Sequence, residues 1–266
     1  MKASSRFLFF FFALFLVSLP YAGGLISANQ REASKYAPHF DPIGGGESAT
    51  YEARWSGIPV ATATINASPI VMDGKKLYEV KIQAQTWKYL ELIWKMRDSI
   101  ESIFEAGTLQ PRRFIFRQRE NRKKIDTTAS FDHESKKWKV HRQEGTKLRQ
   151  YEFVSTNTFD PISAVYLMRS LDFKVGETIQ LEVFGGKSRY LVVLEIASKE
   201  RVALKNGEFD AYKIIPRITN VTRSGYAGRV REATVWISAD EKRKPLKIVS
   251  QVFIGSVNIE VAEKKS

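Results

Sequence analysis

The sequence predicts a mainly β protein in which one strongly curved antiparallel sheet, an open barrel or a β-spiral, encloses a single buried helix near the middle of the chain. Apolar and polar residues alternate with a period of two from residue 51 onward, as they do in half-buried strands. Turn dipeptides such as Asp73-Gly74 and Asn206-Gly207 separate the alternating segments. About a dozen or more strands in one sheet must curl or close.

The composition supports a folded domain and excludes thiol chemistry. The chain has 266 residues, of which 43% are hydrophobic, enough for a sizeable core. It contains no cysteine, which excludes disulfides, thiolate metal sites, thiol nucleophiles and lipid attachment through an N-terminal cysteine.

The N-terminus predicts export. Lys2 and Arg6 precede an apolar run over residues 7–19, which has the length of the apolar region of a signal peptide and is short for a membrane span. We expect a signal peptide over residues 1–22 and a periplasmic protein; an uncleaved N-terminus that anchors the chain in the inner membrane is the alternative. Residues 23–48 are rich in small and polar residues and predict a flexible tether.

A single β-rich domain is expected over residues 49–262. Before the helix, the expected strands lie at residues 51–55, 58–71, 77–87, 94–104, 112–119, 125–131, 136–141 and 147–153. In residues 112–119, Phe114 and Phe116 are expected on one face, and Arg113, Ile115, Arg117 and Arg119 on the other.

The helix is expected to begin directly after Asp160. Asp160 can cap the first turn, and Pro161 fits the first helical position because its missing N–H is not needed there. Residues 162–171 are apolar nearly all round, which predicts a buried helix. Arg169 complements the C-terminal end of the helix, or pairs with a carboxylate such as Asp240.

After the helix, the period of two resumes. The expected strands lie at residues 178–184, 189–196, 201–205, 208–215, 231–238, 246–254 and 257–261, and Trp236 lies on the fifth of them.

Several fragments together resemble a family of exported bacterial proteins known as domain of unknown function 3108 (DUF3108). They are YEARWSGIPV at 51–60, DPISA at 160–164, GEFDAY at 207–212 and VWISAD at 235–240, the last followed by Arg243 and Pro245. The resemblance extends over about residues 49–262 and rests on the order of the fragments. It implies an exported, mostly β domain, and it implies no catalytic residues.

Aromatic residues suggest one candidate binding surface. Trp87, Tyr89, Trp94 and Trp138 could line a groove for acyl chains or sugars, or they could fill the core of a large sheet.

Basic residues suggest a second surface. The chain carries a net charge of +13. Its most basic block predicts a patch for anionic lipid or glycan, unless it is only a solvated outer face. The residues of this patch are Arg113, Arg117, Arg119, Lys123, Lys124 and Lys137.

No motif predicts a metal, a cofactor or a catalytic site. The three histidines lack metal-ligand spacing, and no nucleophile elbow or phosphate-binding glycine loop is present. We therefore expect a non-catalytic envelope protein that binds a lipidic, glycan or protein partner and supports envelope integrity. The alternatives are a basic module for an anionic membrane or cell wall, and an enzyme acting on an envelope polymer. Export disfavours nucleic acid as a partner.

Overall fold

The computed structural model describes residues 20–21, 36–222, 227–228, 233–251 and 255–262. The strands are β1 (Pro20–Tyr21), β2 (Glu47–Trp55), β3 (Ile58–Met72), β4 (Lys75–Thr86), β5 (Arg97–Glu105), β6 (Pro111–Glu120), β7 (Lys123–Asp132), β8 (Lys137–Glu144), β9 (Lys147–Val154), β10 (Thr158–Phe159), β11 (Thr178–Phe184), β12 (Arg189–Leu204), β13 (Gly207–Asn220), β14 (Ala227–Gly228), β15 (Ala233–Ser238), β16 (Pro245–Gln251) and β17 (Ser256–Val261). The helices are α1 (Pro161–Arg169) and a short 3₁₀ turn, η1 (Lys88–Leu90).

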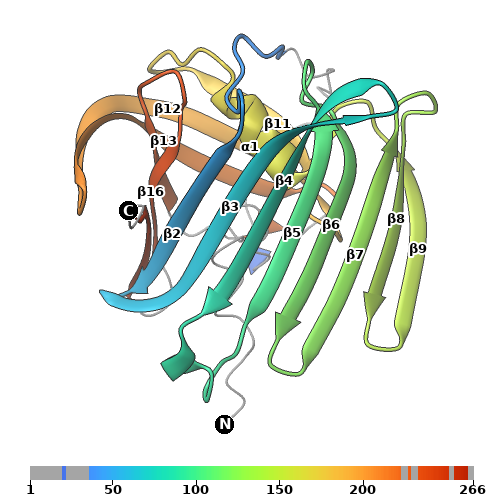
Figure 1. Ribbon diagram of the computed structural model, residues 1–266, viewed down its shortest axis with the longest axis horizontal. Coiled ribbons are helices and arrows are strands. Elements are labelled where there is room, and N and C mark those ends of the chain that lie inside the picture. Colours follow the sequence, from blue (N-terminus) through green and yellow to red (C-terminus); the bar gives the residue numbers. More distant parts are fainter. Residues whose placement is uncertain (1–19, 22–35, 223–226, 229–232, 252–254, 263–266) are drawn as a thin grey trace.

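Fifteen strands form one sheet in the order β10-β11-β12-β13-β15-β16-β17-β2-β3-β4-β5-β6-β7-β8-β9. All neighbours are antiparallel except β10 and β11, and a separate antiparallel pair joins β1 to β14. The large sheet is strongly curved but does not close, because β9 and β10 are its two edges. Figure 1 shows α1 between the arm made of β2 to β9 and the arm that contains β11 to β13. The predicted fold class is therefore confirmed.

The helix lies inside the curve, as its apolar sequence predicts. Eight of its nine residues are buried, and Phe104, Phe159 and Leu167 are almost inaccessible at the centre of the main core. Alternation along β4 places Tyr78, Val80, Ile82, Ala84 and Thr86 on the buried face. The curved sheet therefore packs its apolar face around the helix α1.

The end of the expected tether lies against the domain. The segment 36–46 is described, and β2 begins at Glu47 rather than near residue 51. The Tyr36 hydroxyl accepts from the backbone N–H of Gln180, the Asp41 carboxylate accepts from Tyr78, and Ile43 is buried in the main core. Tyr36, Asp41 and Ile43 therefore attach this segment to the domain. Of the expected signal peptide, only Pro20 and Tyr21 are among the described residues, and residues 22–35 of the expected tether lie outside them.

Ile115, expected on the same face as the arginines of β6, is only 4% exposed. The expected start of one strand needs correction. Strand β5 starts at Arg97 rather than at residue 94, because residues 88–94 form η1 and the turns that follow it. Within the described ranges, no helix is both long and apolar enough to span a membrane.

Candidate functional site

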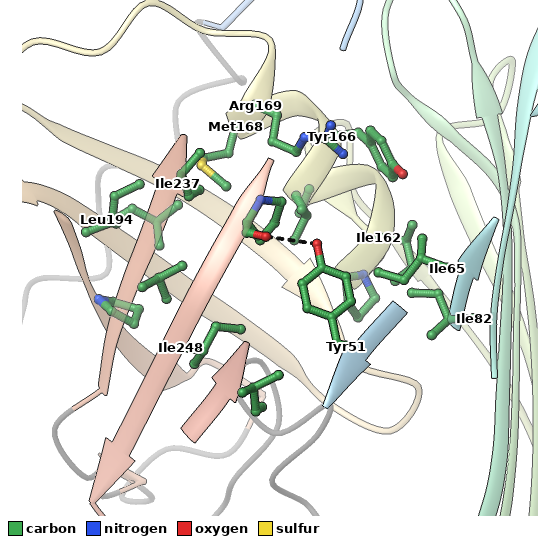
Figure 2. Close-up of a pocket in the computed structure, with 18 of the residues that line it drawn as sticks. Tyr51, Ile65, Ile82, Ile162, Tyr166, Met168, Arg169, Leu194, Ile237 and Ile248 are labelled. Carbon is green, nitrogen blue, oxygen red and sulfur yellow. Dashed lines mark hydrogen bonds between the residues drawn. The ribbon is translucent and has the colours of Figure 1, made fainter. Parts of the chain in front are cut away.

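An apolar cavity of about 170 Å³ lies between α1 and the two arms of the sheet. Figure 2 shows side chains from the helix and from strands of both arms pointing into it. Its lining consists of Glu47, Tyr51, Ala63, Ile65, Ile82, Pro161, Ile162, Ala164, Val165, Tyr166, Met168, Arg169, Leu181, Leu194, Ile214, Pro216, Val235, Ile237, Pro245, Ile248 and Ile259.

The capped N-terminus of α1 fixes the helical wall of the cavity. The Asp160 carboxylate accepts from the backbone N–H groups of Ile162 and Ser163, and the Ser163 hydroxyl accepts from the Asp160 N–H. This capping box satisfies donors that would otherwise be buried without partners. The Ser102 hydroxyl of β5 also donates to Asp160, at 2.8 Å, and ties the helix start to the sheet.

The strands supply the remaining walls through their period of two. Ile65 on β3 and Ile82 on β4 face the cavity from one arm, and their register is paired directly. Leu194 on β12 and Ile214 on β13 face it from the other arm. Aliphatic side chains from many strands therefore surround a space that no single strand defines.

Polar groups gather at one end of the cavity. The Arg169 guanidinium lies 2.7 Å from the Glu47 carboxylate, and the side chains are only 2% and 4% exposed. Arg169 also donates to the carbonyl oxygens of Pro42 and Lys242, and its guanidinium stacks 4.6 Å from the Tyr166 ring centroid. The Tyr51 hydroxyl donates to the Pro245 carbonyl oxygen at 2.9 Å, the dashed line in Figure 2.

Burial shapes the titration of this polar end. Burial raises the pKa of both Tyr51 and Tyr166, so both phenols stay protonated at neutral pH. Burial opposes the charge on Arg169, but the nearby Glu47 carboxylate favours it, and the pKa of Arg169 is raised. The positive charge of Arg169 is therefore balanced by the negative charge of Glu47, and Tyr51 and Tyr166 contribute neutral hydroxyl groups.

The cavity lining contains few ionisable side chains. Glu47 is the one carboxylate among the lining residues, and it is held by Arg169. Within the described ranges, no group of three or more histidine, aspartate or glutamate side chains is close enough to hold a metal ion.

The aromatic residues predicted to line a groove are not brought together. Trp138 is fully buried in the core among Phe131, Phe153 and Phe184. Trp87 and Tyr89 are exposed on the connection between β4 and β5, and Trp94 is partly buried against a smaller cluster around Tyr51 and Met96. None of the four predicted residues lines the cavity.

The predicted basic patch lies on β6 to β8, with its residues in different environments. Arg113, Arg117 and Lys124 are exposed, and Lys123 is partly buried. Arg119 pairs with Asp126 at 2.7 Å, and Lys137 lies 3.8 Å from Glu152.

The residues predicted to have structural roles keep them, with one change of partner. Asp160 and Pro161 begin α1 as expected. Arg169 pairs with Glu47 and not with Asp240, because Asp240 accepts from Ser238 Oγ and from two backbone N–H groups in the turn before β16. Trp236 is half-buried on β15 and donates to Glu200.

Sequence reasoning missed Glu47 and Tyr51 as parts of a site. Glu47 follows three glycines and was counted with the tether. The signal that could have revealed it is its register: Glu47, Ala49, Tyr51 and Ala53 share one face of β2.

Comparison with protein-family models places most of the chain in one family. Residues 50–262 match the model described as "Protein of unknown function (DUF3108)". The chain belongs to the DUF3108 family. A search of the curated proteins found no match for this DUF3108 protein.

Solved structures resemble the DUF3108 chain at the level of the fold. A beta-barrel-like protein of domain of unknown function DUF1849 from Brucella abortus matches with a TM-score of 0.52 and 9% identity, covering 84% of this chain and 100% of that one. A proposed lipoprotein from Parabacteroides distasonis matches with a TM-score of 0.40 and 10% identity, covering 88% and 99%. A DUF1089 family protein from Pseudomonas aeruginosa matches with a TM-score of 0.23 and 10% identity, covering 84% and 95%. The last two scores are too low to support an argument.

Proposed function

We propose that this protein is an exported, non-catalytic cell-envelope protein that binds a lipidic ligand in the cavity beside α1 and so supports envelope integrity. The observation that carries the proposal is the cavity itself: a space of about 170 Å³ enclosed by aliphatic side chains in the middle of a large sheet. Ligand sites are typically apolar hollows with a few polar groups that fix orientation, and this one has its polar groups at one end.

The size of the cavity indicates what part of a ligand it takes. An apolar cavity of roughly 150 Å³ in a protein core binds a molecule as large as benzene. The cavity therefore accommodates a short length of acyl chain or a small apolar ring, with the rest of the ligand outside. Its aliphatic lining favours a lipid over a glycan, which would lose hydrogen bonds to water without replacing them.

The polar end favours an uncharged polar group on the ligand. The charge of Arg169 is already matched by Glu47 at 2.7 Å, so a second carboxylate would compete for a satisfied cation. The Tyr51 hydroxyl, which already donates to Pro245, can accept from a ligand hydroxyl, and the Tyr166 hydroxyl can donate to a ligand hydroxyl or ester oxygen.

Two further considerations support the non-catalytic and envelope parts of the proposal. The cavity lining offers one carboxylate, held in an ion pair, where acid–base hydrolysis needs two working groups. The N-terminal sequence has the charge and apolar length of an export signal. Fractionation of cells tests the second point: periplasmic release supports cleavage, and retention in the inner membrane supports the anchored alternative.

Native mass spectrometry of the protein purified from the periplasm tests the binding proposal. We expect a bound mass that is displaced by an alkyl-chain fluorescent probe. The variants Ala63→Leu and Ala164→Leu fill the cavity from β3 and from α1, and each should lower both the bound mass and the probe affinity. Ala203→Leu, at an exposed position on β12, is the matched control and should bind as the parent does.

Absence of any bound mass, together with equal probe binding by the parent and both cavity-filling variants, would refute the proposal. Circular dichroism of each variant separates a filled cavity from a misfolded chain, since a filled cavity leaves the unfolding transition cooperative.

A further inference from the structure

A cluster of exposed apolar side chains lies on the connection between β4 and β5, at the lower end of the sheet in Figure 1. Leu92 is 98% exposed and Ile93 is 81% exposed. Trp87 and Tyr89 of the same connection are also exposed. The Tyr89 hydroxyl donates to the carbonyl oxygen of Pro59, which places exposed Ile58 of β3 beside them. We call these five residues, Ile58, Trp87, Tyr89, Leu92 and Ile93, the apolar tip.

The backbone holds the apolar tip in an ordered series of turns. The N–H of Trp87 donates to Val60 of β3 at 3.1 Å, and the N–H groups of Ile93 and Trp94 donate to the Leu90 carbonyl at 2.9 and 2.7 Å. Beyond the tip, Lys95 exchanges two hydrogen bonds of 2.8 Å with Asn121 in the turn between β6 and β7. Leu92 and Ile93 are therefore exposed to the solvent on an ordered loop that is hydrogen-bonded to strand β3 and to the turn between β6 and β7.

Basic residues lie in the same connection as the apolar tip and in the turn that is hydrogen-bonded to it. Residues 87–97 and the adjoining turn at 120–124 contain six basic side chains and two carboxylates. The basic residues are Lys88, Lys95, Arg97, Arg122, Lys123 and Lys124. Of the carboxylates, Glu91 is held by Arg97 and Lys95, and Glu120 is buried. These two segments therefore carry a net positive charge.

We propose that the apolar tip docks on an anionic lipid bilayer. Leu92 and Ile93 enter the edge of the hydrocarbon region, and Trp87 and Tyr89 lie at the headgroup level, where amphipathic rings are preferred. The lysines and arginines of the two segments contact lipid phosphates. The combination of two protruding aliphatic residues, interfacial aromatic rings and these basic residues fits a lipid surface better than a second copy of this chain, which would bring like charges together. The proposal does not depend on the ligand of the cavity.

The lack of cysteine in the chain allows a site-specific test. The full chain carrying Leu92→Cys is labelled with an environment-sensitive fluorophore and mixed with vesicles of phosphatidylethanolamine and phosphatidylglycerol. We expect a blue-shifted, brighter emission that weakens as salt is raised, because salt screens the attraction to the phosphates. The control label is placed at Val71→Cys, an exposed position at the opposite end of β3 and β4, and should not respond.

Unlabelled protein provides the second measurement. The double variant L92S/I93S should sediment with the same vesicles at least about tenfold less strongly than the parent, because it lacks the two aliphatic side chains that enter the bilayer on binding. Because both positions are exposed, the variant should fold normally, and the parent and the variant share any contribution of the N-terminal segment. Equal vesicle binding by the two proteins, or no response of the label at residue 92, overturns the proposal. A label response that depends on protein concentration without lipid overturns it in favour of self-association.

Discussion

The guanidinium of Arg169 and the carboxylate of Glu47 form a 2.7 Å ion pair that joins the end of α1 to the start of β2 inside the core. The two residues are 122 positions apart in the chain. Arg169 also donates to the carbonyl oxygens of Pro42 and Lys242, so the pair joins four segments at the polar end of the cavity. A buried pair of this kind is costly to break, since removal of one partner leaves an uncompensated charge.

We predict that Arg169→Met lowers the free energy of unfolding by about 3–5 kcal/mol, because it leaves the Glu47 carboxylate buried without a partner. The double variant E47M/R169M should recover much of this loss, since apolar residues of similar volume can replace a buried pair. Urea unfolding followed by tryptophan fluorescence measures both changes.

The matched control is Arg217→Met, which breaks a 2.9 Å pair with Glu195 in which the arginine is 73% exposed. Its cost should be about 0–1 kcal/mol. If E47M/R169M loses as much stability as Glu47→Met and Arg169→Met do together, the pair is not coupled as described.

Asp160 provides a second prediction, because its carboxylate caps α1 and accepts from Ser102 of β5. Asp160→Ala should cost about 2–4 kcal/mol, as it removes the cap and leaves a buried hydroxyl without an acceptor. Asp160→Asn should stay within about 1 kcal/mol of the parent, because asparagine is also a good N-cap. Burial raises the pKa of Asp160, so loss of its charge removes a desolvation cost.

Thermal unfolding of both Asp160 variants checks this expectation. Equal destabilisation by alanine and asparagine would show that the charge, and not the hydrogen-bond acceptor, is what the helix start needs.

The parts of the fold that could be predicted from the sequence are those that local chemistry determines. Asp160 and Pro161 together identify the first residue of α1. The alternation from Tyr78 to Thr86 assigns each of these residues of β4 to one face of the sheet. The large number of strands expected in one sheet then requires curvature, since a flat sheet of this size would be unusual.

The parts that could not be predicted depend on residues distant in the chain. The partner of Arg169 is decided by the pairing of β2 with β17 and β3, which no local pattern encodes. The cavity is a space that packed side chains leave between α1 and both arms of the sheet, so it belongs to no single motif. Trp138 is a further example, because the alternating pattern of a strand does not distinguish a tryptophan in the core from one that lines a groove.

Gly255 provides a third prediction, because a side chain there would collide with the turn between β2 and β3. It has φ of +80°, and an added Cβ would lie 2.2 Å from the Ser56 hydroxyl. Gly255→Ala should cost about 1–3 kcal/mol from the backbone conformation alone. Gly107→Ala, with no atom within 4 Å of the added Cβ, is the control and should be near neutral. The double variant S56A/G255A should regain the steric part of the loss in urea unfolding; no recovery would place the cost wholly in the backbone.

Asp98 provides a pH-dependent prediction. It is 6% exposed on β5 and accepts from the backbone N–H of Arg119 at 2.7 Å. Burial, with the nearby Glu120 carboxylate, raises the pKa of Asp98 from 3.8 to about 6, against the opposing effect of that hydrogen bond and of Lys123 and Arg119. The folded protein therefore binds this proton more tightly than the unfolded chain does. The charged form destabilises the fold above pH 6, and this loss is regained as the pH falls from about 6 towards 3.8.

Asp98→Asn should accordingly raise the free energy of unfolding at pH 7.5 by up to about 3 kcal/mol, which corresponds to a pKa shift of about two units. The gain should shrink as the pH falls below 6 and disappear once the pH is below 3.8, where the parent is protonated in both states. Urea unfolding of both proteins across this range measures the difference. A constant gain at every pH would contradict the prediction, because it would assign the effect to packing rather than to the buried charge.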